Sequence, residues 1–355
     1  MADIRLSICI PTYNFGKFIG ETLDSITKNL TDGVEVVILD GGSVDDTCEV
    51  VAKRQVNYPQ IKYYNQGYKG GIDKDIAKTV SLAEGTYCWL FSADDLMKPG
   101  AVSKLLYFME SGCDIYLCEQ TACDFEMHPT MEWPIFRRIR KSEIFDLKDI
   151  SERERYFTEA RTSEAFFSYL AGPIFRKEIW KMADGIPESF YGTCWGIAGR
   201  LLSLFPSGFK IHYIGESLIY KRGTNKSGEN TSFHDRGVVN LFRMSVEGYT
   251  HIAETIFGIN SFEAFHIQRV LRNEWSFKSL LYLKLAVSIN PMREDINILK
   301  RVAEKHYKNA GIINKFKYEL FLVIPVSVIK HIRILKRLVS GISNKITGKN
   351  KLKVV

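Results

Sequence analysis

The stretch LSICIPTYN (residues 6–14) decides the fold, together with two later stretches, VEVVILDGGS (34–43) and YCWLFSADD (87–95). Each begins with an apolar run that is typical of a buried strand and ends in small and polar residues. Apolar residues at helical spacing fill the intervals between them. Strands that alternate with helices predict an α/β fold, in which helices flank a mixed, mostly parallel sheet.

The polar residues of these stretches come directly after each expected strand. They are Pro11-Thr12-Tyr13, Asp40-Gly41-Gly42 and Ser92-Ala93-Asp94-Asp95. In open α/β sheets, ligands bind outside the carboxyl ends of the strands. We therefore expect the three clusters to converge on one edge of the sheet and to form a ligand site within the first 120 residues.

Asp94 and Asp95 are the strongest chemical signal at this edge. Carboxylate oxygens suit Mg²⁺ or Mn²⁺, which proteins usually hold with one or two carboxylates plus substrate phosphates. Such a metal would neutralise a diphosphate leaving group. The alternative is that the two acids only cap a loop before Lys98 and Pro99.

Residues 7–14, 36–47 and 83–95 resemble, in order and separation, the N-terminal blocks of family 2 glycosyltransferases. The resemblance implies a GT-A fold, a nucleoside-diphosphate sugar as donor, a divalent metal (Mn²⁺ or Mg²⁺) and inversion at the anomeric carbon. The variant blocks GGIDKD (70–75) and WLFSADD (89–95) are similar to those of a subgroup of bacterial O-antigen transferases. That subgroup includes abequosyltransferases, which add a dideoxyhexose.

The resemblance also implies site residues, except that Asp73 and Lys74 are selected from a helix that lacks the Arg/Asn pair usual in the family. Those expected at the donor are Pro11, Thr12, Tyr13, Asp40, Asp73, Lys74, Ser92, Ala93 and Arg222, and those expected at the metal are Asp94, Asp95 and His234. Ser92 stands where the family has the first acid of its metal motif, so one carboxylate is missing. The alternative for Asp73 and Lys74 is a solvated first helical turn, and for His234 an ordinary surface or core position.

The general base is the least defined part of the expected site. An inverting transferase needs a carboxylate to take the proton of the acceptor hydroxyl. The family places this base in a Glu-Asp pair, but the corresponding stretch here, residues 184–195, has no such pair. Glu188, Asp184 and Glu164 are the candidates, and for each of them a structural role is the alternative.

Charge is concentrated at the end of the chain. The net charge is +7, and residues 315–355 hold ten Lys or Arg against one acid, Glu319. A basic tail indicates an anionic partner. Since the acceptors of the resembling subgroup are carried on a membrane polyprenyl diphosphate, we expect an anionic membrane surface rather than nucleic acid. Apolar residues at helical spacing, Val328, Ile332, Leu335 and Val339, would form the membrane-facing side of a basic helix.

These observations predict three regions: a donor-binding half at 1–120, an acceptor-binding half at 121–236, and a helical, basic, membrane-associating region at 237–355. No apolar stretch is long enough for a signal peptide or a membrane span. The expected protein is therefore cytoplasmic and peripheral at the inner face of the cell membrane. Two alternatives stay open, namely a sugar nucleotidyltransferase and a non-catalytic binding or scaffold protein on a degenerate GT-A fold.

Overall fold

The computed structural model describes residues 4–183, 185–186, 188–223, 237–291, 294–308 and 310–331. The chain divides into two compact units. The first unit comprises residues 1–231 and 248–270 and contains the sheet, and the second comprises residues 232–247 and 271–355 and is helical where it is described. The expected boundary at 236–237 differs from this division, which gives residues 248–270 to the sheet unit.

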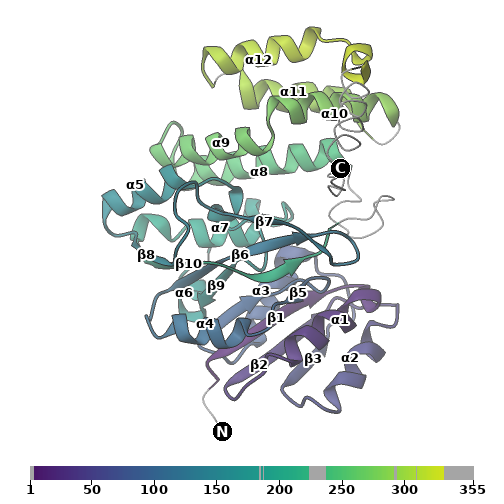
Figure 1. The fold of residues 1–355 in the computed structure, drawn as a ribbon, viewed down its shortest axis with the longest axis vertical. Coiled ribbons are helices and arrows are strands. Elements are labelled where there is room, and N and C mark those ends of the chain that lie inside the picture. The colour runs from purple at the N-terminus through teal and green to yellow at the C-terminus, as the bar shows by residue number, and fades with distance from the viewer. Residues whose placement is uncertain are drawn as a thin grey trace, which may run out of the picture. The chain divides into compact units, whose positions relative to one another are not determined.

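The sheet confirms the fold expected from the sequence (Figure 1). Its strand order is β3-β2-β1-β4-β9-β6-β10-β5, with β7 beside β6 and β8 beside β10. The strands are β1 (Leu6–Thr12), β2 (Val34–Asp40), β3 (Ile61–Asn65), β4 (Tyr87–Leu90), β5 (Leu96–Met97), β6 (Ile115–Cys123), β7 (Pro129–Trp133), β8 (Glu143–Asp146), β9 (Pro173–Arg176) and β10 (Lys210–Lys221). The first four strands are parallel, and antiparallel β9 joins them to the parallel pair β6 and β10.

Helices cover both faces of the sheet, and the central strands β1, β2 and β4 bury side chains on both sides. Helices α1 (Gly16–Thr27), α2 (Thr47–Gln55) and α4 (Ala101–Met109) share an apolar core with alternate residues of β1. On the other face, α3 (Ile72–Leu82) packs on β1 and β2, and Trp180 of α6 (Lys177–Met182) stacks on Phe175. The remaining elements before residue 231 are α5 (Ile150–Glu159), α7 (Gly196–Leu202) and the short 3₁₀ helices η1 (Ser163–Phe166), η2 (Glu188–Phe190) and η3 (Phe205–Ser207).

The helices after residue 237 are α8 (Val238–Phe257), α9 (Phe262–Glu274), α10 (Phe277–Ile289), α11 (Ile296–Tyr307) and α12 (Ile312–Val323). The first part of α8 forms a core with α10, α11 and α12. Within the second unit, Phe242, Leu280, Val302 and Phe321 pack together. Helix α12 ends just before Pro325, as a proline without an N–H dictates. Among the described residues, no helix has both the length and the apolar character needed to cross a membrane.

Three of the sequence predictions lie outside the described residues: Asp184, His234, and the part of the basic tail from 332 to 355.

Candidate active site

The carboxyl ends of β1, β2 and β4 meet at one edge of the sheet, as expected. Thr12 and Asp40 are partners across β1 and β2, and the Gly41 N–H donates to the Thr12 carbonyl at 2.9 Å. The Phe91 N–H donates to the Cys9 carbonyl at 2.8 Å, so the chain stays in register until the loop at 92–95 begins. Parallel pairing therefore places the three polar clusters along a single edge.

Asp40 is completely buried at the end of β2. Its Oδ1 accepts a hydrogen bond from the Ser43 N–H at 2.7 Å, and its Oδ2 accepts one from the Tyr63 hydroxyl at 2.5 Å. Burial and the neighbouring carboxylate raise the pKa of Tyr63, which keeps this hydroxyl a donor. Each oxygen of Asp40 thus has a protein partner, and the carboxylate fixes the loop after β2.

The end of β1 presents unsatisfied and aromatic groups beside this loop. Pro11 and Thr12 are buried, and the Thr12 hydroxyl oxygen has no hydrogen-bond partner among the described residues. Lys69 Nζ lies 4.2 Å from the centroid of the half-buried Tyr13 ring. The buried Asp75 accepts a hydrogen bond from Gln66 Nε2 at 2.6 Å. Asp75 belongs to the GGIDKD block, but nothing in the sequence pattern singles out Lys69.

The loop that follows β4 holds its two acids in different ways. Ser92, in the place of the missing acid, donates its hydroxyl to Asp94 Oδ1, and Ala93 is buried beside it. Asp95 Oδ2 accepts from the Tyr169 hydroxyl at 2.6 Å, and its Oδ1 accepts from the Arg222 N–H at 2.8 Å. Asp95 is therefore an anchor for the loop, whereas Asp94 Oδ2 receives no hydrogen bond from a neighbouring residue in the described part of the chain.

Burial dominates the electrostatics of this loop. Desolvation and the charge of Asp94 raise the pKa of Asp95 to about 7. Desolvation also raises the pKa of Asp94, against the opposing effects of the Ser92 hydroxyl and the Arg222 charge. A nearby cation would favour the charged carboxylates, because opposite charge stabilises the ionised form.

Each nitrogen of the Arg222 guanidinium group has a partner, and Nε binds this loop. Its Nε donates to the Asp94 carbonyl at 2.8 Å, its Nη1 to the Phe125 carbonyl at 2.7 Å, and its Nη2 to Glu21 at 2.6 Å. In this structure Arg222 therefore positions the acidic loop. The neighbouring Lys221 places its Nζ 4.7 Å from the ring centroid of Tyr169, and sequence reasoning did not select it although it adjoins Arg222.

The residues at the loop fit a divalent cation only in part. No cluster of three or more His, Cys, Asp or Glu side chains suited to a metal occurs among the residues that the structure describes. Asp94 can offer one carboxylate oxygen, while Asp95 already uses both of its oxygens. One carboxylate suffices for Mg²⁺ or Mn²⁺ when substrate phosphates and water complete the shell.

Asp73 links α3 to the segment before α7. Its Oδ2 accepts from the Gly192 N–H at 2.7 Å and the Cys194 N–H at 3.2 Å, and its Oδ1 accepts from the Gly196 N–H at 3.0 Å. A β-carbon on Gly196 would lie 2.8 Å from Asp73 Oδ1, so only glycine fits this close approach. Asp73 thus orders the loop at 192–196, whereas Lys74 is exposed.

Two of the three candidate bases can be described. Glu164 in η1 is buried, and its Oε1 accepts a 3.2 Å hydrogen bond from Gln120 Nε2. Its Oε2 has no partner within the described chain and is shielded from solvent. Glu188 in η2 is exposed. A buried carboxylate oxygen without a donor is energetically unfavourable, so a hydroxyl or a water that donates to Glu164 Oε2 would stabilise it.

Comparison with known proteins identifies the domain. Residues 7–163 match the family described as Glycosyl transferase family 2. The chain is 29% identical over 339 residues to the abequosyltransferase RfbV of Salmonella typhimurium, which covers 92% of this chain and 97% of that protein. It is 30% identical over 109 residues to a GalNAc(5)-diNAcBac-PP-undecaprenol beta-1,3-glucosyltransferase of Campylobacter jejuni, covering 35% of that protein.

Solved structures share the fold. S. aureus TarS 1-349, crystallised with UDP-GlcNAc, superposes with a TM-score of 0.59 at 18% identity and covers 86% of this chain and 82% of its own. The mannosyltransferase PcManGT from Pyrobaculum calidifontis, solved with GDP-Man and Mn²⁺, gives a TM-score of 0.50 at 14% identity, covering 91% and 86%. Residues 7–163 therefore match a family 2 glycosyltransferase domain, and the chain over nearly its whole length is similar to an abequosyltransferase.

Proposed function

We propose that the protein is an inverting, metal-dependent glycosyltransferase that moves a sugar from a nucleoside diphosphate to a hydroxyl of a saccharide acceptor. The observation that carries this proposal is the loop at 92–95. There, Asp95 is tied down by Tyr169 and Arg222 while Asp94 keeps an oxygen available at the sheet edge. This edge is where α/β folds bind nucleotides.

Different residues would contact different parts of the donor. Thr12 supplies an unpaired hydroxyl, and Tyr13 a ring surface, for the nucleoside. Asp94 would hold a divalent cation, which would neutralise the charge that develops on the diphosphate leaving group. Lys221 adds a protein cation beside the acidic loop. Through its three backbone hydrogen bonds, Asp73 positions the segment at 192–196 on the acceptor side.

Among the candidate bases, the burial of Glu164 supports it over exposed Glu188. Its Oε2 lacks a partner among the described residues and would accept the proton of an incoming acceptor hydroxyl. Tyr169, a few residues along the same segment, donates to Asp95, so the segment that carries Glu164 is tied to the acidic loop. Attack from the side opposite the leaving diphosphate would invert the anomeric configuration.

The acceptor class is proposed from the relatives. One relative is named for abequosyl transfer and another for an acceptor linked to PP-undecaprenol. We therefore take the acceptor to be a polyprenyl-diphosphate-linked O-antigen intermediate, and the donor sugar to be a dideoxyhexose such as abequose. An enzyme that uses such an acceptor would work at the inner face of the cell membrane, where its basic tail would meet anionic lipid.

The test is a transfer assay with a panel of nucleoside-diphosphate sugars, including a dideoxyhexose donor, and a lipid-linked acceptor. The product is analysed by mass spectrometry and by NMR of its anomeric proton. A product of inverted configuration, formed with Mn²⁺ or Mg²⁺ and lost with a chelator, is expected. Synthesis of a nucleotide sugar from a nucleoside triphosphate would instead show a nucleotidyltransferase, and donor binding without turnover would show a binding protein.

A further inference from the structure

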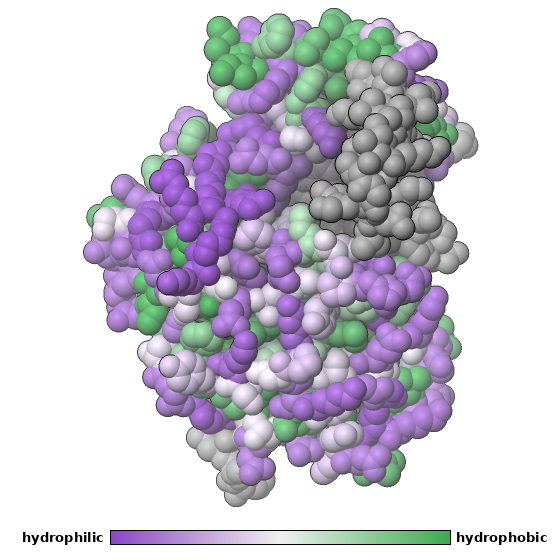
Figure 2. Space-filling view, viewed as in Figure 1, coloured by the Kyte–Doolittle hydropathy of each residue, from purple (hydrophilic) through white to green (hydrophobic). Residues whose placement is uncertain are grey.

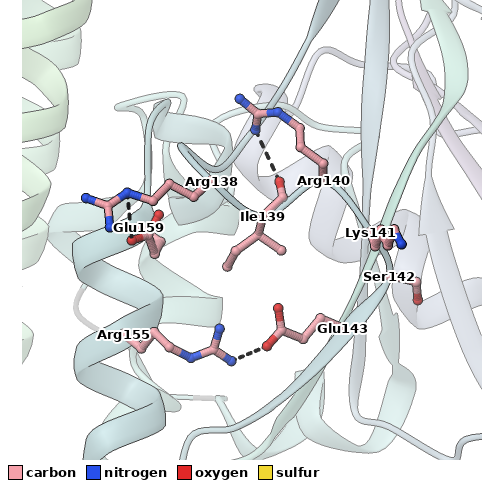
Figure 3. Close-up of a pocket in the computed structure, with 8 residues that line it drawn as sticks. All are labelled: Arg138, Ile139, Arg140, Lys141, Ser142, Glu143, Arg155 and Glu159. Atoms are coloured by element: carbon pink, nitrogen blue, oxygen red, sulfur yellow. Dashed lines mark hydrogen bonds and ion pairs between the residues drawn. The ribbon is translucent and has the colours of Figure 1, made fainter.

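A second polar site lies away from the sheet edge, in the segment that leads into β8. It is a pocket of about 510 Å³ lined by Arg138, Ile139, Arg140, Lys141, Ser142, Glu143, Arg155 and Glu159 (Figure 3). Hydrophilic residues gather on the left of Figure 2, in the area where Figure 1 labels α5 and β8. We call these eight residues the basic pocket, since four of them are cations and two are acids.

The positive charges of the basic pocket are unevenly compensated. Arg155 is paired with Glu143 and, at 2.8 Å, with Glu152. Arg138 reaches Glu159 only at 3.9 Å, and its side chain is 87% exposed. Exposed Arg140 and Lys141 form no ion pair within the described part of the chain. Three cationic groups therefore face solvent with little neutralising charge, which creates a positive potential that attracts anions.

The segment that carries these cations is rigidly supported. Arg140 Nη1 donates to the carbonyls of Phe136 at 2.5 Å and Ile139 at 3.1 Å, which holds the loop in one shape. The Phe136 ring is fully buried, with the Tyr213 ring 4.9 Å away. Gly215 has a positive φ and lies so close to Lys141 that a β-carbon would be 2.7 Å from its carbonyl carbon. The backbone of this segment and the Arg140 side chain are therefore ordered before a ligand binds, which lowers the entropy lost on binding.

The basic pocket is separate from the nucleotide edge. Glu143 pairs with Tyr213 near the start of β10, whereas Arg222, which holds the acidic loop, directly follows the end of that strand. Because β10 is bulged, Tyr213 lies opposite Leu117 and Lys221 opposite Ala122 of β6, so the two positions are five strand residues apart, or roughly 17 Å. A nucleotide at Asp94 would therefore not occupy the basic pocket.

We propose that the basic pocket binds a phosphate or diphosphate group. Guanidinium groups match phosphate oxygens with two parallel N–H donors, and Lys adds a point charge. Arg138, Arg140 and Lys141 would supply these donors, and the volume of the pocket exceeds that of a single phosphate. The group has two possible sources, a lipid headgroup and a soluble diphosphate, and the experiment separates them. The proposal does not depend on the identity of the donor sugar.

The experiment compares full-length wild type with the double variant Arg138→Glu and Lys141→Glu. Among the described residues, neither side chain donates a hydrogen bond to the backbone, so both changes should leave the fold intact. The matched control is Lys28→Glu and Lys53→Glu, which makes the same charge change at exposed positions of the sheet unit. Inorganic pyrophosphate is titrated by calorimetry in EDTA, which removes any metal-bridged binding at Asp94. Vesicles of phosphatidylcholine, with and without phosphatidylglycerol, are sedimented at low salt.

Pyrophosphate should bind wild type and the control equally, and the double variant at least tenfold more weakly. A parallel loss of binding to phosphatidylglycerol vesicles in the double variant, relative to the control, assigns the site to a lipid headgroup. Unchanged vesicle binding with lost pyrophosphate binding assigns it to a soluble diphosphate. Equal pyrophosphate affinity of all three proteins, or none in wild type, overturns the proposal.

Discussion

The sheet unit and the helical unit bury acidic side chains in different ways. In the helical unit, the buried acid among the described residues is Glu294, whose two oxygens accept from the N–H groups of Val238 and Val239 at the start of α8. In the sheet unit, Asp94 and Glu164 each have an oxygen to which no residue in the described part of the chain donates a hydrogen bond. A buried carboxylate therefore indicates a reaction site only where it has acceptor capacity that the fold does not use.

The first prediction concerns the Asp94 carboxylate, which has an acceptor oxygen that the fold does not use. Asp94→Asn keeps the size of the side chain but loses its charge, so we expect kcat to fall by about 10²–10³-fold, because the leaving diphosphate loses its stabilisation. The measurement is the transfer assay, with Asp32→Asn as an exposed control. A kcat near that of wild type would show that Asp94 has no part in the reaction.

The second prediction concerns an acid of the sheet unit whose oxygens are both occupied. Asp73→Ala leaves the N–H groups of Gly192, Cys194 and Gly196 without this acceptor. We expect a loss of about 3 kcal/mol in unfolding free energy, since hydrogen bonds to charged groups are strong. KM for the acceptor should rise more than the affinity for donor falls, and Asp73→Asn should recover part of the loss.

Denaturant unfolding and separate titrations of donor and acceptor measure these two effects. If Asp73→Ala weakened donor binding alone and left stability unchanged, Asp73 would be a donor ligand instead of a positioning residue.

The third prediction applies the same test to the helical unit. Glu294→Ala removes both acceptors at the start of α8, so we expect a loss of about 2 kcal/mol in stability. Activity per folded molecule should not change, because neither oxygen of Glu294 is available to a ligand. The measurements are urea unfolding and a kinetic assay at low temperature. A lower kcat in folded Glu294→Ala would show that Glu294 contributes to the reaction and not to stability alone.

The fourth and smallest effect is a pH dependence in the helical unit. Burial and the charge of Arg272 lower the pKa of His306 to about 3, from 6.5. The unfolded chain binds a proton below pH 6.5 and the folded chain does not, so stability is complete above pH 6.5 and declines as the pH falls. Between pH 7.5 and 5.5 this difference is about 1 kcal/mol.

Replacing His306 by Phe should remove this contribution, because a phenyl ring fits among the rings of Phe242 and Tyr307 and does not titrate. Unfolding free energies of wild type and variant are compared at several pH values. Parallel pH profiles would mean that His306 is not the group responsible.

Sequence patterns predicted the sheet well because the pattern of each strand is local. The runs ending at Thr12, Asp40 and Phe91 gave the correct edge, and the acidic loop followed from its position alone. The antiparallel insertion of β9 between β4 and β6 was not predicted, since strand order depends on contacts between residues far apart in the chain.

The same limit applies to the site. Asp73 and Arg222 were expected at the donor, but their partners lie far away in sequence and could not be predicted from a local pattern. Both side chains hold loops in the structure. The burial of Glu164 and the anchoring of Asp95 by Tyr169 also depend on tertiary packing. The resemblance indicated which chemistry to expect, and the structure shows which side chains have capacity left for it.

The central claim, a metal-assisted nucleotide site at the sheet edge, is tested most directly by thermal unfolding with a panel of nucleoside diphosphates. A ligand that binds only the folded state must raise the melting temperature. We predict that at least one nucleoside diphosphate stabilises wild type with Mn²⁺ or Mg²⁺ and not with EDTA, and that Asp94→Ala removes this stabilisation. No stabilisation by any nucleotide, or stabilisation that persists in Asp94→Ala and in EDTA, would contradict the account.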